Sequence, residues 1–181
     1  MKRLRDPAIT LPKTRIRSLG VMALKGRLDK AMEIVGAFAA AHPEVKVYLN
    51  GYLKPYANRR MKLQSDVFLG SRVDALLSLG GDGTFLAAAR LVRGEKVPVL
   101  GVNLGRVGFL ADVSLDNLRQ SLEELPRRDY TLRRRMMLDV EHWRGKKKIF
   151  PQCKHIHDKL NYFLCKSLCT CHKIHKNAAF Y

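Results

Sequence analysis

One segment of the sequence, an apolar run followed at once by glycines and then by a helix, constrains the fold more than any other. Residues 74–79 form a nearly continuous apolar run, which is typical of a strand buried on both faces of a parallel sheet. The segment Gly80-Gly81-Asp82-Gly83-Thr84 follows, and the residues after it predict a helix that ends near Gly94. A strand that turns directly into a helix predicts an α/β domain.

The rest of the chain repeats this pattern. Strands are predicted at 18–24, 45–49 and 97–102, a helix after Gly26, and an extended strand over 130–143 that leaves the domain. A further helix is predicted from Leu118 to Leu125, with Ser114 as its N-cap and Pro126 closing it. Residues 52–72 are less regular, with a short helix predicted over 59–64. The expected fold is an open, mostly parallel sheet with helices on both faces.

The loop after the apolar strand has the features of an anion-binding site. Glycines let the backbone approach a ligand, and the first amides of a helix lack internal partners and point outward with the positive end of the helix dipole. Open α/β sheets also place their ligands at the carboxyl ends of the strands. The loop therefore predicts a phosphate-binding site.

Asp82 does not fit a site for phosphate alone, because an ionised carboxylate repels a phosphate placed against it. It would suit a ligand hydroxyl that must lose its proton, or a magnesium ion that bridges phosphates. The alternative is that Asp82 caps the helix and the glycines make a tight turn. The residues alone leave both interpretations open.

Composition and charge limit the classes of protein to which this chain can belong. Apolar residues make up 46% and charged residues 28%, which indicates a folded globular chain. The net charge is +18, but residues 143–181 carry nine Lys or Arg against one Asp, so the first 142 residues hold +10 (25 basic minus 15 acidic). We therefore expect nucleotide substrates and not nucleic acid. We also expect no membrane span and no secretory signal, and hence a cytoplasmic protein.

The composition changes near residue 143. All four cysteines and four of the six histidines follow residue 150, at spacings that do not match ordinary zinc modules. The sequence there lacks strand alternation and a clear amphipathic helix. We expect a nucleotide-binding domain over 1–142 and, over 143–181, a Cys/His/Lys-rich tail that is disordered or non-native.

Two segments resemble the NAD kinase family: Leu77 to Leu86, which contains GGDGT, and Val99 to Asp112, which reads VLGVNLGRVGFLAD. The resemblance covers roughly residues 15–142. GGDGT alone is shared with lipid kinases of the diacylglycerol and sphingosine type, and phosphofructokinases have a close variant. The second segment favours NAD kinase. The P-loop and G-x-G-x-x-G fingerprints are absent.

The resemblance implies transfer of the γ-phosphate of ATP, or of another phosphoryl donor, to the adenosine ribose 2'-hydroxyl of NAD, with Mg²⁺ assisting. Asp82 would be the base, Gly83 would contact the dinucleotide through its backbone, and Phe109 would pack beside the adenine unless it is a core residue. Arg106 is a candidate phosphate-binding cation, and Arg135 is a further one without a clear role. The full set of expected nucleotide-binding residues is Gly80, Gly81, Asp82, Gly83, Thr84, Leu86, Asn103, Gly105, Arg106, Gly108 and Phe109.

The chain departs from the family after residue 145. Family members continue into a largely β second domain that begins with an Asn-Glu or Asn-Asp pair, and neither is present here. We expect a truncated or frame-shifted product, a divergent or shortened protein being the alternative. A homo-oligomer stays an open alternative that the absence of that domain disfavours. The functional alternatives are a nucleotide-binding remnant without turnover, a basic nucleic-acid-binding module and, as a minor one, a lipid kinase.

Overall fold

The computed structural model describes residues 15–92, 95, 97–105, 108–111, 113–132, 136–144, 147–157 and 179–180, with side chains described up to Leu132. The chain divides into two compact units, Met1–Leu132 and Arg133–Tyr181. The division comes before the compositional break near residue 143. Each unit is described by itself.

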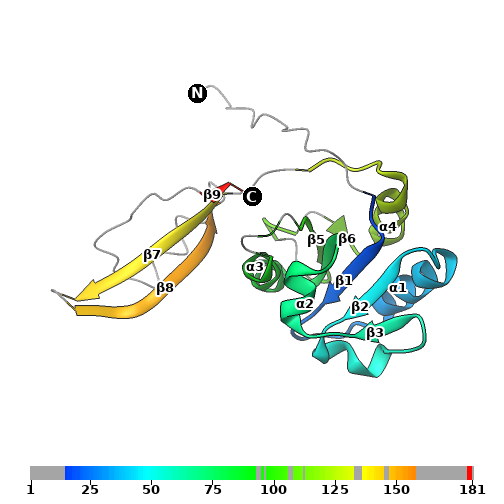
Figure 1. The fold of residues 1–181 in the computed structure, drawn as a ribbon, viewed down its shortest axis with the longest axis horizontal. Helices are drawn as coiled ribbons and strands as arrows, with labels where there is room; N and C mark the ends of the chain where they lie inside the picture. The colour runs from blue at the N-terminus through cyan, green and yellow to red at the C-terminus, as the bar shows by residue number, and fades with distance from the viewer. Residues whose placement is uncertain are drawn as a thin grey trace. The chain divides into compact units, whose positions relative to one another are not determined.

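The first unit is an α/β domain built on one open sheet (Figure 1). Its strands are β1 (Ser18–Met22), β2 (Lys46–Leu49), β3 (Met61–Leu63), β4 (Ala75–Gly80), β5 (Val99–Asn103) and β6 (Val113–Ser114). Its helices are α1 (Asp29–Ala41), the 3-10 helix η1 (Gly51–Tyr56), α2 (Asp66–Ser71), α3 (Asp82–Leu91) and α4 (Leu118–Arg127). All pairings are parallel, in the order β3-β2-β1-β4-β5-β6. The predicted fold class is confirmed.

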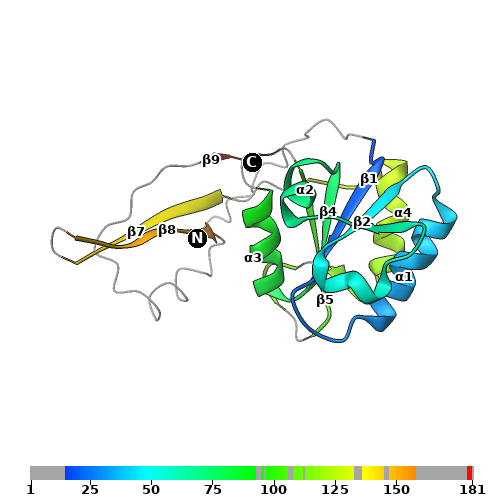
Figure 2. The ribbon, with the colours of Figure 1, turned by 60° about the horizontal axis from the view of Figure 1, so that its bottom comes forward.

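The helices cover both faces of this sheet, α1 with α4 on one side and α2 with α3 on the other (Figure 2). Alternate strand residues point to opposite faces. In β4, Leu77 and Leu79 belong to the core under α1 and α4, whereas Leu76 belongs to the core under α2 and α3. Because both faces are covered, β4 is apolar almost throughout, as the sequence predicts.

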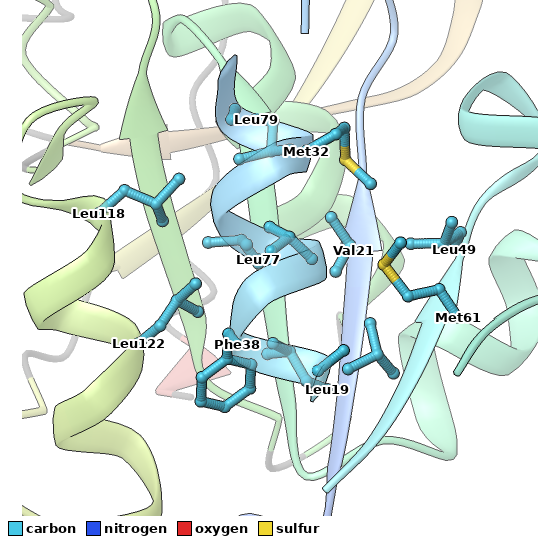
Figure 3. Packing of buried hydrophobic residues seen from close by; sticks show 14 of the residues in the cluster. Leu19, Val21, Met32, Phe38, Leu49, Met61, Leu77, Leu79, Leu118 and Leu122 are labelled. Carbon is cyan, nitrogen blue, oxygen red and sulfur yellow. The ribbon is translucent and has the colours of Figure 1, made fainter. Parts of the chain in front are cut away.

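The larger core lies between the sheet and the pair α1 and α4 (Figure 3). Phe38 of α1 and Leu122 of α4 pack there against residues of β1 and β4, and Leu122 is fully buried. Truncating a buried leucine such as Leu77 to alanine is expected to cost about 2–5 kcal/mol. This packing makes the sheet a rigid base for the loops at its edge.

The strand order reverses direction between β1 and β4. From β1 the chain adds β2 and β3 on one side, and then crosses to place β4, β5 and β6 on the other. The carboxyl ends of the strands beside such a switch point form the crevice in which open α/β sheets bind ligands. The loop that contains Asp82 directly follows β4 and therefore lies at this crevice.

The prediction of a short helix over 59–64 is wrong, because Met61–Leu63 forms β3 beside β2. The Asn58 side chain accepts the N–H groups of Arg60 and Met61 (2.8 and 3.0 Å), a local turn that competes with helix formation. Met61 is 4% exposed in the larger core. Pairing with β2 and burial of Met61 therefore override the local pattern.

The prediction that Ser114 caps the next helix is also wrong. Ser114 lies in β6, opposite Asn103 of β5, and α4 begins only at Leu118, with Asn117 as its N-cap. A turn joins the two elements, with N–H bonds from Asn117 to the Ser114 carbonyl and from Leu118 to that of Leu115 (both 3.2 Å). The pairing with β5 decides the role of Ser114.

The second unit contains an antiparallel sheet in the order β8-β7-β9. β7 (Met136–Arg144) matches the predicted extended segment, and it pairs with β8 (Lys147–His157) and β9 (Ala179–Phe180). The strands β8 and β9 give regular structure to parts of the segment 143–181, whose assignment as a separate tail stays a prediction. Pairing with β7 supplies their backbone hydrogen bonds, which local alternation in the sequence does not reveal. That the tail is non-native stays a prediction.

Candidate functional site

The predicted glycine loop forms a tight connection between β4 and α3. Gly81 is the N-cap of α3, and its carbonyl accepts the N–H groups of Thr84 and Phe85 (3.0 and 3.1 Å), which closes the first helical turn. Residues 75–79 before the loop are buried. A rigid strand and an immediate helix start thus fix where the loop backbone lies.

The Asp82 carboxylate joins this loop to a second one, 27 to 29 residues further along the chain. Its Oδ2 accepts the N–H of Phe109 at 3.0 Å, and its Oδ1 accepts those of Leu110 and Ala111 at 3.1 and 3.4 Å. Asp82 is half-buried in this arrangement. The structure therefore brings the two motifs of the sequence together through one carboxylate.

Two glycines are required by the close packing of these loops. A Cβ at Gly108 would overlap Asp82 Oδ1 and lie 2.8 Å from Asp82 Cγ, and a Cβ at Gly80 would overlap Thr84 Oγ1. Gly80 also has a positive φ of 159°. Thr84 itself is 5% exposed, so its side chain serves the packing of the loop. Packing within the protein therefore accounts for glycine at positions 80 and 108, without any contribution from a ligand.

Three other glycines of the predicted site are not explained in that way. A Cβ added at Gly81, Gly83 or Gly105 would meet no atom within 4 Å. All three are exposed. A glycine in open space lets a ligand approach the backbone closely, which is the property that the sequence predicts for this loop.

Phe109 is not a core residue. It is 62% exposed, whereas its neighbours Leu110 and Ala111 are 2% and 8% exposed. The interpretation of Phe109 as a packing residue is therefore wrong for this structure. A largely exposed aromatic side chain is available to stack on a planar ligand.

The end of β5 lies beside the glycine loop. Asn103 is paired with Gly80 across the sheet, the carbonyl of Gly80 accepts the N–H of Leu104 (3.0 Å), and the Asn103 side chain accepts that of Gly105 (3.0 Å). Leu86 is half-buried further along α3. Arg106 and Arg135, the two arginines predicted from sequence, lie outside the described residues.

The structure adds a feature that the sequence analysis missed, a hollow of about 300 Å³ at the carboxyl ends of β1 and β5. Arg27 and Lys30 contribute two cations to its lining, together with Asp29, Ala31, Leu104 and Leu115. Among the residues that the structure describes, no hydrogen bond or ion pair occupies Arg27 or Lys30. The signal in the sequence was Lys25-Gly26-Arg27 between a strand and a helix.

Asp29, the acidic residue of this hollow, already has a partner. The hydroxyl of Tyr56 donates a hydrogen bond to Asp29 Oδ1 at 2.8 Å, and this bond raises the pKa of Tyr56 above its ordinary value. A tyrosine that stays protonated keeps donating to the carboxylate. The two cations therefore remain available to an anionic ligand.

The described part of the chain contains neither a cluster of metal-binding side chains nor a membrane-spanning helix. It brings together no group of three or more His, Cys, Asp or Glu side chains that could hold a metal ion. Magnesium with one or two protein carboxylates needs phosphate oxygens and waters for its remaining ligands. None of the described helices is long and apolar enough to cross a bilayer.

Comparison with known proteins agrees with these motifs. The sequence model of the ATP-NAD kinase N-terminal domain matches residues 4–130, more than half of the chain. The NAD kinase of Rhodococcus jostii (strain RHA1) is 49% identical over 75 residues, which are 41% of this chain and 23% of that protein. The NAD kinase of Flavobacterium psychrophilum is 41% identical over 88 residues, which are 49% of this chain and 30% of that protein.

A solved structure supports the fold. The yeast NADH kinase complexed with NADH superposes with a TM-score of 0.61 at 17% identity, over 80% of this chain and 47% of that one. At this identity the likeness concerns the fold alone. The chain spans about a quarter of the length of the curated relatives that it matches.

Proposed function

Because the chain belongs to the NAD kinase family, we propose that its first unit is the nucleotide-binding part of an NAD kinase. The reaction transfers the γ-phosphate of ATP, or of another phosphoryl donor, to the adenosine ribose 2'-hydroxyl of NAD, and produces NADP and ADP. The observation that carries the proposal is the position of the Asp82 carboxylate at the start of α3, directly beside the exposed Phe109.

Asp82 is the proposed general base. A carboxylate offers about four lone-pair positions, and among the described residues Oδ1 accepts two N–H groups and Oδ2 only one. Oδ2 is therefore the oxygen that takes the proton as the ribose O–H bond breaks. The ribose oxygen then bonds to the γ-phosphorus, and the bond between that phosphorus and the leaving ADP oxygen breaks.

Phe109 is the proposed platform for the adenine of NAD. Its side chain is exposed and its backbone N–H lies 3.0 Å from Asp82 Oδ2, so an adenine that stacks on the ring would hold its ribose near Asp82. Gly81 and Gly83, whose Cβ positions are open, would let the nucleotide approach the first turn of α3. Stacking and backbone contact together place the hydroxyl, which is the main source of rate in phosphoryl transfer.

Arg27 and Lys30 are proposed to receive phosphates of the substrates. Two cations in one hollow beside the switch point would offset the charge that develops on the transferred group. Magnesium would be held mainly by the phosphates themselves, because the described residues build no cage for it. Binding of Arg106 to phosphate and a cytoplasmic location stay predictions.

An assay specific for NADP tests the proposal. The purified 181-residue chain is incubated with NAD, ATP and Mg²⁺, and NADP is measured over time. Formation of NADP supports the proposal. A parallel reaction with diacylglycerol in place of NAD tests the lipid kinase alternative, and phosphorylation of the lipid without NADP would overturn the proposed acceptor.

A further inference from the structure

The three N–H groups of residues 109–111 converge on the carboxylate of Asp82, and we call this set of hydrogen bonds the clamp. Leu110 and Ala111 are buried, so their side chains hold the loop from the inside, while the carboxylate holds its backbone from the other side. Between these two supports, Phe109 is kept outward at 62% exposure. A phenylalanine that is mostly exposed gains little burial energy, so other contacts must maintain it in this position.

We infer that Asp82 positions the Phe109 platform in addition to acting on the substrate, and that Gly108 is the positioning residue that makes this possible. The inference rests on the proposed function, in which Phe109 receives the adenine of NAD. One set of hydrogen bonds then fixes both the base and the aromatic ring. The distance between adenine and carboxylate is set by the protein before the substrate arrives.

Gly108 is essential to the clamp because it lies against the carboxylate. A Cβ at this position would overlap Asp82 Oδ1. The same added Cβ would lie 2.8 Å from Asp82 Cγ, so the carboxylate as a whole would have to shift. An alanine at position 108 is therefore expected to push the carboxylate away from the N–H groups of residues 109–111.

An amide in place of the carboxylate breaks the clamp selectively. The Asn side chain has one acceptor oxygen, which can keep the bonds from Leu110 and Ala111, but its NH₂ group cannot accept the N–H of Phe109. Asp82→Asn is therefore expected to loosen Phe109 and weaken NAD binding, whereas loss of a base alone would lower turnover and leave binding unchanged. Loss of a hydrogen bond to a charged group corresponds to roughly tenfold or more in affinity.

The test combines amide hydrogen exchange with NAD titration on the full chain. Wild type, Gly108→Ala and Asp82→Asn are compared with Gly51→Ala, a control at a glycine whose Cβ would meet no atom within 4 Å. We expect both test variants to lose protection at 109–111 while residues 76–79 of β4 stay protected, and to bind NAD about tenfold more weakly. Gly51→Ala should match wild type.

The possible failures are distinguishable. Wild-type chain that does not bind NAD overturns the proposed function and, with it, the adenine platform. Wild type that binds NAD, with variants that lose protection at 109–111 but keep their NAD affinity, overturns the positioning role alone. Retained protection in both variants overturns the clamp. If Gly108→Ala fails to fold, Asp82→Asn gives the same three results, because it preserves the size of the side chain.

Discussion

Gly80 at the end of β4 lies opposite Asn103 at the end of β5, and its carbonyl accepts the N–H of Leu104 at 3.0 Å. The loops that follow the two strands therefore start side by side at one edge of the sheet. This register explains why residues far apart in the sequence form one site. Gly80 is in addition a structural residue, because any side chain at this position would overlap Thr84.

Alanine substitutions at Gly80 and Gly81 should differ in their effect on the free energy of unfolding. Gly80→Ala should lower the free energy of unfolding by roughly 1–3 kcal/mol, since its Cβ overlaps Thr84 Oγ1. Gly81→Ala should cost less than about 1 kcal/mol, because its φ of −111° and ψ of −163° suit alanine and its Cβ position is open. Urea denaturation measures both. Equal losses of stability would contradict the distinction.

Phe109 should matter for binding and not for stability. Because it is 62% exposed, Phe109→Ala should leave the unfolding midpoint nearly unchanged. It should raise the dissociation constant for NAD by about tenfold or more, as stacking of a base on an aromatic ring is worth roughly 1–3 kcal/mol. Val67→Ala, at a residue that is 78% exposed on α2, is the matched control. An unchanged NAD affinity in Phe109→Ala would exclude the platform.

Arg27 and Lys30 should act on polyanionic substrates. The double variant Arg27→Ala with Lys30→Ala should raise the KM for ATP or the dissociation constant for NAD by about tenfold, because two phosphate contacts are lost. The salt dependence of binding should become shallower for the same reason. The pair Arg59→Ala with Arg60→Ala, at two exposed arginines that do not line the hollow, is the control for the loss of two positive charges. Equal effects of the control and the double variant would count against a local site.

His42 predicts a dependence of stability on pH. Partial burial lowers the pKa of His42, but its hydrogen bonds with Glu123 (2.9 Å) and Glu44 (3.2 Å) outweigh burial, so the pKa is raised above the ordinary 6.5. A raised folded-state pKa means that this stabilisation is complete below the unfolded pKa and is lost as the pH rises through the folded one.

The measurement compares wild type with His42→Gln by urea denaturation near pH 6 and near pH 8.5. The stability difference should be larger at the lower pH, by less than about 1 kcal/mol, because the pair is near the surface. Glutamine keeps hydrogen-bonding capacity but cannot carry the charge. The same difference at both pH values would exclude titration of His42 as the cause.

The sequence predicted those parts of the fold that are determined by neighbours in the chain. β4, its glycine loop and α3 follow one another directly, so periodicity and glycine placement were sufficient. β3 and β6 were missed because pairing with β2 and β5 forms them, and Ser114 was assigned to a cap for the same reason. β8 likewise depends on pairing with β7.

In the candidate site, too, the sequence predicted what depends on neighbours in the chain and missed what depends on contacts between distant segments. Asp82, Phe109 and the glycines between them were recognised from two motifs, but no local pattern indicated that the carboxylate accepts the N–H groups of 109–111. The exposure of Phe109 depends on which side of its loop packs inward. The segment Lys25-Gly26-Arg27 was the one sequence signal for the hollow, and only the fold brings Arg27 and Lys30 together with Leu104.

The most direct test is the rate of NADP formation by wild type, Asp82→Asn and Asp66→Asn. Asp66 is also the first residue of a helix, α2, and is exposed, so its variant removes the same charge at an equivalent position. We predict that Asp66→Asn equals wild type and that Asp82→Asn, measured with saturating NAD, is slower by at least about 100-fold. NADP formation that persists within a few-fold in Asp82→Asn, or that is absent from wild type, would contradict the account.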